Sequence, residues 1–219
     1  MKNYAITTAR YLYDEHKQEI LQFETMYTEY LAEFNFQLLI LPSLLDVQIF
    51  DQINPQLVLL PGGGDVPAEY YDSDVNVVAQ QCRNQIEVAL ISCAVRRNIP
   101  ILGICRGMQM LNGYFGGKLT RGPSPSHPVA INHSVRILGC GHTCLANSYH
   151  RDFIEKKALS KNFEPIALHE NCEHIEAFIG KDCPILGLQW HPERMNQNNP
   201  CRKYSSKLIR KLISKGKIT

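Results

Sequence analysis

Short, uninterrupted apolar runs of strand length recur along the first half of the chain. They are YAITTA from Tyr4, FQLLILP at 36–42, LVLLP at 57–61 and IPILGIC at 99–105. Strands that are apolar at every position fit a parallel sheet that is covered on both faces. Patterns with helical spacing separate these runs, at 16–34 and 81–98. The alternation predicts a three-layer α/β sandwich with a mostly parallel central sheet.

The second half of the sequence follows a different pattern. Strand-like segments follow one another there with turn residues and little helical periodicity between them, at 133–138, 163–170, 174–180 and 183–190. We therefore expect a strand meander that completes the sheet, and then an amphipathic helix from about Pro200 to Lys215. The proline-rich segment at 121–128 predicts an irregular loop. The 219 residues fit one domain, 1–219.

Composition limits the classes of partner that this chain would bind. The 23 Lys and Arg residues nearly balance the 21 Asp and Glu residues, so there is no electrostatic basis for binding nucleic acid or an anionic membrane. Neither a signal-peptide pattern nor a run of about 18 apolar residues occurs. We expect a cytoplasmic protein with a small-molecule partner, and homo-oligomerisation is left open. The eight cysteines are expected to be free thiols, most of them buried.

One cysteine occupies a position that is typical of a nucleophile. The order strand, Gly103-Ile104-Cys105-Arg106-Gly107, helix has the form G-x-nucleophile-x-G, whose sharp turn leaves no room for a Cβ at either glycine. The turn would hold Cys105 clear of the sheet at a helix N-terminus, whose dipole favours the thiolate. The motif alone is weak evidence, because a small core cysteine would fit the same pattern.

A histidine near the end of the chain could serve that cysteine. GLQWHPER, residues 187–194, places His191 and Glu193 at the C-terminal end of a predicted strand, where open α/β sheets carry their sites. A cysteine nucleophile needs a base, and the base needs an acceptor on its second nitrogen. Cys105, His191 and Glu193 could supply these three roles. Considered by itself, His191 would instead be a core histidine bonded to a backbone carbonyl.

A glycine run follows another predicted strand, in LLPGGGD at 59–65. The backbone N–H groups of Gly63 and Gly64 can point at a ligand there. With the amide of Arg106 they could form the oxyanion hole that acyl transfer requires. A flexible turn is the alternative for a glycine run in isolation.

Together, LLPGGGD, PILGICRGMQMLN and GLQWHPE resemble, in their order and separations, the class I glutamine amidotransferase-like superfamily. The closer resemblance is to its peptidase C26 branch of γ-glutamyl hydrolases, and it covers nearly the whole chain. It implies a flavodoxin-like fold, no cofactor, and a triad that cleaves a γ-glutamyl amide through a thioester. The triad would consist of Cys105, His191 and Glu193.

The same resemblance implies which residues hold the glutamyl group. Gln109 would contact its α-amino and α-carboxylate groups, and Ser148 and Tyr149 in NSYHRD would lie beside it, mostly through backbone contacts. The segment from Gly117 to His133 is shorter than in many C26 hydrolases. The side of the site that receives the leaving group is therefore undefined.

The resemblance predicts a hydrolase that releases glutamate and an amine from a small γ-glutamyl compound. The amine could be γ-aminobutyrate, a folate-type polyglutamate or a nucleotide phosphoramidate such as CDP-amidate, and Arg106, Arg121 and Arg151 would suit an anionic leaving group. The first alternative is a glutaminase subunit that delivers ammonia to a separate synthase partner. A second is a catalytically silent binding module.

A metal site is an alternative from another class. Two groups of soft ligands lie close together in the sequence, namely Cys140, His142 and Cys144, and His169, Cys172 and His174. The C-x-H-x-C spacing is short for a zinc loop and assures no fourth ligand. We therefore expect no metal.

Overall fold

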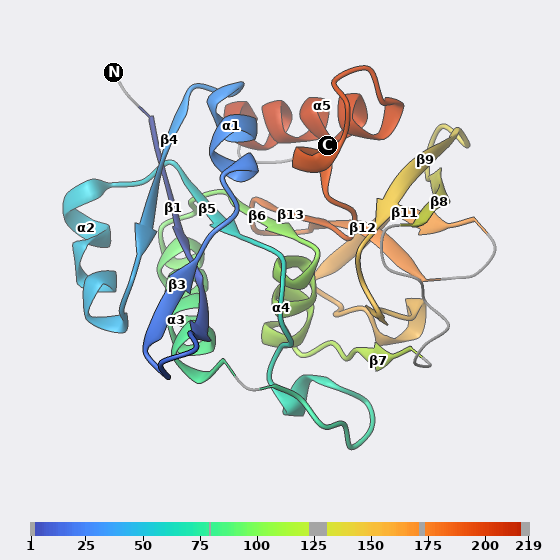
Figure 1. Ribbon diagram of the computed structural model, residues 1–219. Coiled ribbons are helices and arrows are strands. Elements are labelled where there is room, and N and C mark those ends of the chain that lie inside the picture. The colour runs from blue at the N-terminus through green and yellow to red at the C-terminus, as the bar shows by residue number, and fades with distance from the viewer. Residues whose placement is uncertain (1–2, 79, 123–130, 171–173, 216–219) are drawn as a thin grey trace.

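A nine-stranded sheet is the centre of the computed structural model, which describes residues 3–78, 80–122, 131–170 and 174–215 (Figure 1). Its strand order is β4-β1-β5-β6-β13-β12-β11-β8-β9. The first five strands in this order run parallel. They are β4 (Phe36–Leu41), β1 (Asn3–Thr8), β5 (Leu57–Leu60), β6 (Ile101–Ile104) and β13 (Ile185–Leu188). β5, β6 and β13 are buried throughout, as their apolar runs predict.

The remaining four strands form the predicted meander, because each is antiparallel to its neighbour. They are β12 (Ile175–Gly180), β11 (Phe163–His169), β8 (Ile131–Ile137) and β9 (Thr143–Ser148). β9 lies outside the strand-like segments that the sequence pattern predicts. Two small antiparallel pairs lie outside the main sheet. One consists of β2 (Arg10–Tyr13) and β3 (Glu19–Gln22), the other of β7 (Thr120–Arg121) and β10 (Asp152–Phe153).

Helices cover both faces of the sheet and confirm the predicted three layers. Buried residues of α1 (Met26–Ala32) and α5 (Pro200–Lys215) belong to one core cluster, and those of α3 (Gln81–Arg96) and α4 (Arg106–Tyr114) to the other. In Figure 1, α1 and α5 lie together at the top of the view. The short elements are α2 (Phe50–Ile53) and the 3₁₀ turns η1 (Leu44–Ile49), η2 (Ala68–Tyr70), η3 (Lys156–Ala158) and η4 (Pro192–Arg194).

The segment 16–34 does not form the single helix that its spacing predicts. β2 and β3 make a hairpin, and α1 begins only at Met26. The Asp14 carboxylate accepts hydrogen bonds from the N–H groups of His16 and Gln18, at 2.9 and 2.8 Å. This local turn competes with a helix for the same backbone donors. Within α1 the helical spacing holds for the buried residues Tyr27, Tyr30 and Leu31.

The cysteines also differ from expectation. Cys144 and Cys201 form a disulfide bond that joins β9 to α5, with their Cα atoms 5.7 Å apart, so the prediction of free thiols is wrong for this pair. Among the described free cysteines only Cys105 is buried, whereas Cys82 and Cys140 are exposed. The expectation that most cysteines fill the core is therefore wrong as well.

The C-terminal helix has the predicted bounds, and Leu208, Ile209 and Leu212 are buried as its spacing requires. No helix in the described part of the chain is both long and apolar enough to cross a membrane. Most of the proline-rich loop predicted at 121–128 lies outside the described residues, which resume at 131.

Candidate active site

Cys105 occupies the sharp turn between β6 and α4. Its φ of 52° and ψ of −107° are rare for any residue with a side chain. A Cβ at Gly103 would lie 2.7 Å from the carbonyl carbon of Gly107, and a Cβ at Gly107 would lie 1.9 Å from the Leu60 oxygen. Backbone strain of this kind, of about 1–3 kcal/mol, persists only where the surrounding structure enforces it. The neighbouring elements therefore fix the direction of the Cys105 side chain.

His191 and Glu193 lie beyond the end of β13, and both are buried. The distance from His191 Nδ1 to Glu193 Oε1 is 2.5 Å. Because an ionised carboxylate only accepts hydrogen bonds, the hydrogen lies on Nδ1. The Nε2 atom is then the nitrogen that His191 can offer to Cys105.

The pKa of His191 is raised from 6.5 to about 9. Burial acts in the opposite direction, because it disfavours the charged imidazolium. The negative charge of Cys105 and a hydrogen bond to that residue outweigh burial, and Glu193 raises the pKa further. The surroundings of His191 thus favour its protonated, imidazolium form.

Asn147, which the sequence patterns did not single out, holds the backbone of His191. Its Oδ1 accepts the His191 N–H at 2.8 Å, and its Nδ2 donates to the His191 carbonyl at 2.9 Å. Asn147 lies on β9, at the other end of the meander from β13. It begins the NSYHRD segment, but its partner lies 44 positions away, so only the fold shows the pairing.

The glycine loop after β5 lies against the His191 ring, since a Cβ at Gly62 would be 2.6 Å from its Cε1 atom. Gly63 and Gly64 have φ values of 86° and 79°, which favour glycine. The Gly62 N–H donates to the Tyr27 hydroxyl at 2.9 Å. The structure thus brings the predicted oxyanion loop beside His191.

A buried arginine holds the carbonyl side of this loop. Arg83, on α3, donates to the Gly63 carbonyl and the Pro61 carbonyl at 2.6 Å each, and to the Gly62 carbonyl at 3.2 Å. Hydrogen bonds to these oxygens fix the peptide planes, and with them the directions of the N–H groups. Arg83 is therefore a positioning residue that the sequence reasoning missed.

Glu87 joins Arg83 to a second buried arginine, Arg106. Its two carboxylate oxygens accept from Arg83 Nε at 2.9 Å and from Arg106 at 2.5 Å. Burial and the charge of Arg106 lower the pKa of Arg83 to about 10, against the effect of Glu87. Arg106 also donates to Asn84 and to the Asp65 carbonyl. Its guanidinium is thus engaged inside the protein, which corrects the expectation that it faces an anionic leaving group.

Gln109 lies one helical turn after Cys105 and is buried. Its Nε2 donates to the Asp152 carbonyl at 3.1 Å and to Gln189 Oε1 at 3.2 Å. Gln109 therefore connects α4 with the segments that follow β9 and β13.

Ser148 and Tyr149 lie where β9 ends. Ser148 is buried, and the Tyr149 ring packs edge-on against His191, with centroids 5.5 Å apart. The Arg194 guanidinium lies 4.5 Å from the centre of the Tyr149 ring and pairs with Glu24 at 2.6 Å. The structure therefore places Tyr149 directly against the proposed base.

The other two arginines considered for an anionic leaving group differ from each other. Arg121 donates to Asp152 at 3.2 Å and to Asp65 at 2.9 Å. Burial lowers the pKa of Arg121, but hydrogen bonds to Asp152 and Tyr71 raise it overall. Arg151 keeps 43% of its side-chain surface exposed. Arg151 is thus the more accessible of the two.

Neither metal cluster suggested by sequence spacing has its full set of ligands in the described residues. Cys144 is oxidised to a disulfide with Cys201, and Cys172 lies outside the described residues. The rings of His169 and His174 have centroids 6.4 Å apart.

Comparison with known proteins identifies the family of the chain. The family model "Glutamine amidotransferase class-I" matches residues 18–210. A glutamine amidotransferase-like protein of Lactococcus lactis is 32% identical over 156 residues, which are 62% of this chain and 65% of that protein, so the match spans less than two thirds of its length. The γ-glutamyl-CDP-amidate hydrolase of Campylobacter jejuni is 34% identical over 142 residues, 65% of this chain and 64% of that protein.

The fold has solved counterparts as well. The crystal structure of a glutamine amidotransferase of Thermotoga maritima superimposes with a TM-score of 0.59 at 19% identity, covering 96% of this chain and 86% of that one.

Proposed function

The chain belongs to the class I glutamine amidotransferase family, and from that premise we propose that it is a cysteine-dependent γ-glutamyl hydrolase of the C26 type. It would cleave the amide bond of a small γ-glutamyl compound and release glutamate and an amine. The observation that carries the proposal is the enforced turn at Cys105, coupled to a buried His191–Glu193 pair.

In the first step the Cys105 thiolate attacks the γ-carbonyl carbon, and the carbonyl electron pair moves onto oxygen. The N–H groups of Gly63, Gly64 and Arg106 would stabilise this oxyanion. When the intermediate collapses, the C–N bond breaks and the His191 imidazolium gives its proton to the departing nitrogen. A glutamyl thioester and the free amine result.

In the second step water cleaves the thioester. The water oxygen attacks the thioester carbonyl while neutral His191 takes a proton from that water. The C–S bond then breaks and returns the Cys105 thiolate. Glu193 would hold the imidazole orientation throughout. The reaction consumes one water and needs no oxidant, reductant or cofactor.

The glutamyl group would occupy the space bordered by Gln109, Ser148 and Tyr149. The family and the 34% identical relative that is named as a γ-glutamyl-CDP-amidate hydrolase support a glutamyl group as the acyl part of the substrate. For the amine, the candidates are γ-aminobutyrate, a folate-type polyglutamate and a nucleotide phosphoramidate. The Arg151 side chain, although 43% exposed, already pairs with Asp65 at 3.5 Å and with Asp152 at 3.4 Å, so it does not select among these amines.

A glutaminase subunit is the second candidate, because the family description is that of amidotransferases. Such a subunit would hydrolyse glutamine and pass ammonia to a synthase on another chain. The chemistry at Cys105 would be identical, so only the substrate and the need for a partner separate the two functions.

A substrate panel tests the proposal directly. Glutamate release is measured from glutamine, γ-glutamyl-γ-aminobutyrate, a polyglutamylated folate and a γ-glutamyl nucleotide phosphoramidate. We expect a γ-glutamyl amide other than glutamine to be cleaved by the protein alone, and cleavage to be lost in Cys105→Ala. Cys82→Ser removes an exposed thiol and should retain activity.

Cleavage of glutamine alone, and only after a synthase is added, would instead establish the glutaminase subunit. Binding of γ-glutamyl compounds without turnover, equal in the native protein and in Cys105→Ala, would establish a silent binding module.

A further inference from the structure

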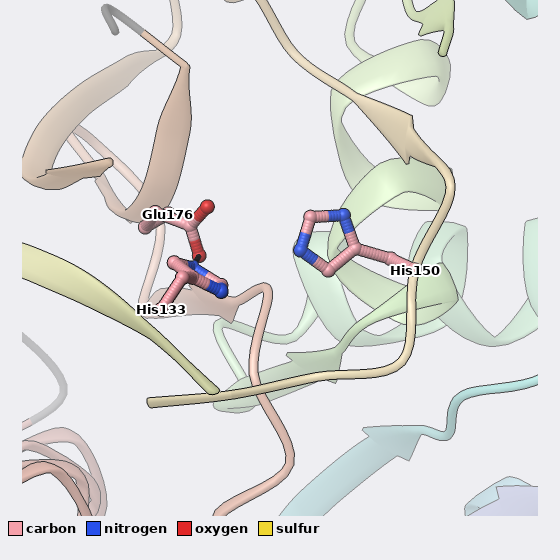
Figure 2. A group of neighbouring side chains, drawn as sticks. All are labelled: His133, His150 and Glu176. Carbon is pink, nitrogen blue, oxygen red and sulfur yellow. Dashed lines mark ion pairs between the residues drawn. The ribbon is translucent and has the colours of Figure 1, made fainter. Parts of the chain in front are cut away.

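A second cluster of ligand-type side chains includes none of the residues Cys105, His191 and Glu193. His133 on β8, Glu176 on β12 and His150 just after β9 converge although they are distant in sequence (Figure 2). One ligand atom from each lies within 4.8 Å of the others. Glu176 is 1% exposed and His150 is 8% exposed.

We propose that His133, His150 and Glu176 form a binding site for one divalent transition-metal ion of the zinc class. Two imidazole nitrogens and one carboxylate oxygen are the donor set that such ions take in proteins, with a remaining position open to water. None of the three residues belongs to the clusters that sequence spacing suggests.

The hydrogen bonding of His150 prepares it for this role. The distance from its Nδ1 to the Asp152 carbonyl oxygen is 3.1 Å. A carbonyl only accepts, so this contact places the hydrogen on Nδ1 and leaves the lone pair on Nε2. Metal-binding histidines typically have their second nitrogen oriented in this way. In Figure 2 a ring nitrogen of His150 faces Glu176 and His133.

The spacing of the cluster needs little adjustment. His133 Nε2 and Glu176 Oε2 are 3.1 Å apart. In a tetrahedral site with metal–ligand bonds of about 2.0–2.1 Å, the ligand atoms lie about 3.3 Å from one another. The His150 nitrogen lies within 4.8 Å of the other two ligand atoms, so small side-chain rotations would bring it to that distance.

The charge of Glu176 supports a cation at this place. A carboxylate buried to this extent needs a positive charge beside it. A divalent ion bound between the three side chains would supply that charge.

The site would stabilise the region around the proposed glutamyl pocket. The Glu176 carbonyl accepts the Gln189 N–H at 2.8 Å, and the Gln189 side chain accepts from Gln109 at 3.2 Å. His150 follows Ser148 by two residues. An ion would thus link β8, β12 and the end of β9, and this inference does not depend on the proposed function.

Metal binding is tested on the full chain in a Cys105→Ala background, which removes the catalytic thiol as a ligand. Protein stripped with a chelator is titrated with Zn²⁺, and the bound metal is measured by elemental analysis after desalting. We expect one zinc per chain and a rise in Tm. His150→Gln and Glu176→Gln should weaken binding by more than about 100-fold, because loss of a second-shell contact alone weakens it 10- to 100-fold.

His142→Gln is the matched control, since His142 is an exposed histidine, and its affinity should be unchanged. Circular dichroism checks that each variant folds. If a variant does not fold, the Co²⁺ absorption spectrum of the Cys105→Ala protein identifies the ligands instead. A site of nitrogen and oxygen ligands gives no thiolate charge-transfer band.

Three results would overturn the proposal. They are less than stoichiometric zinc after desalting, equal affinity in folded His150→Gln or Glu176→Gln, and a Co²⁺ spectrum with a thiolate band. The first would mean that the cluster holds no zinc of its own.

Discussion

At the scale of single residues, His191 combines two opposed influences. Burial disfavours its charged form, yet Cys105 and Glu193 raise its pKa from 6.5 to about 9. The proposed mechanism uses both members of the resulting pair, since the thiolate attacks and the imidazolium protonates the leaving nitrogen. The pH dependence of activity is therefore set by this pair.

We predict that kcat/KM for the best panel substrate falls as pH rises through about 9, the pKa of His191, because neutral imidazole cannot protonate the amine.

The contribution of His191 to the free energy of unfolding should change with pH in the same direction. Because the pKa of His191 is higher in the folded than in the unfolded protein, its protonation stabilises the fold. This stabilisation is fully present below pH 6.5 and is lost as the pH rises through about 9. Initial rates and urea unfolding from pH 6 to about 10 test both statements. A rate that is still rising above pH 9 would contradict the assignment of the acid.

Glu193→Gln should lower kcat by at least about 100-fold, since it removes the charge that stabilises the imidazolium. It should also move the alkaline fall in kcat/KM to lower pH, because Glu193 contributes to the raised pKa of His191. The control is Glu19→Gln on the exposed strand β3. A rate loss without a shift in the pH profile would show that Glu193 acts on packing alone.

At the scale of elements, the close approach of α4 to β5 determines where Cys105 can point. A Cβ at Gly107 would lie 1.9 Å from the Leu60 oxygen. That oxygen belongs to backbone, so the strand and helix would have to separate.

Gly107→Ala should therefore reduce the free energy of unfolding by about 3 kcal/mol or more, the upper end for overpacking, and should abolish activity. Gly139→Ala is the control. Gly139 has a φ of +88° but no atom within 4 Å of an added Cβ, so this variant carries only backbone strain of about 1–2 kcal/mol. Urea unfolding of both variants measures the difference, and equal losses would contradict the predicted collision.

At the scale of the whole molecule, the Cys144–Cys201 disulfide and the Asn147–His191 hydrogen bonds both connect the end of the meander to the C-terminal part of the chain. Residues 144 and 201 are separated by 57 positions. Closing a loop of that length corresponds to roughly 4 kcal/mol in the chain-entropy model.

Cys201→Ser should lower the free energy of unfolding by about 2–4 kcal/mol. Dithiothreitol should lower the Tm of the native protein to about the Tm of the Cys201→Ser variant. The Tm of the variant itself should not change on reduction. Cys82→Ser, an exposed free thiol, should respond to the reductant as the native protein does. An unaltered Tm of the native protein under reduction would show that the bond does not form.

The sequence alone predicted the features that depend on neighbours along the chain. Apolar runs and helical spacing gave the three layers and the meander, because burial of a strand or helix face must appear in its own residues. The positions of Cys105, His191 and Glu193 were predicted in the same way, from turn and strand-end motifs. Spacing failed at 16–34, where the Asp14 turn made a hairpin from residues that also fit a helix.

Only the tertiary structure decided which distant residues meet. Four contacts join elements that are far apart in sequence. They are the hydrogen bonds of Arg83 to the glycine loop, those of Asn147 to the His191 backbone, the Cys144–Cys201 disulfide and the His133–His150–Glu176 cluster. Such contacts depend on how the sheet orders its strands, and no local pattern records that order. The sequence therefore determined the fold class and the candidate nucleophile, whereas the packing of the sheet and helices determined what holds that nucleophile's partners in place.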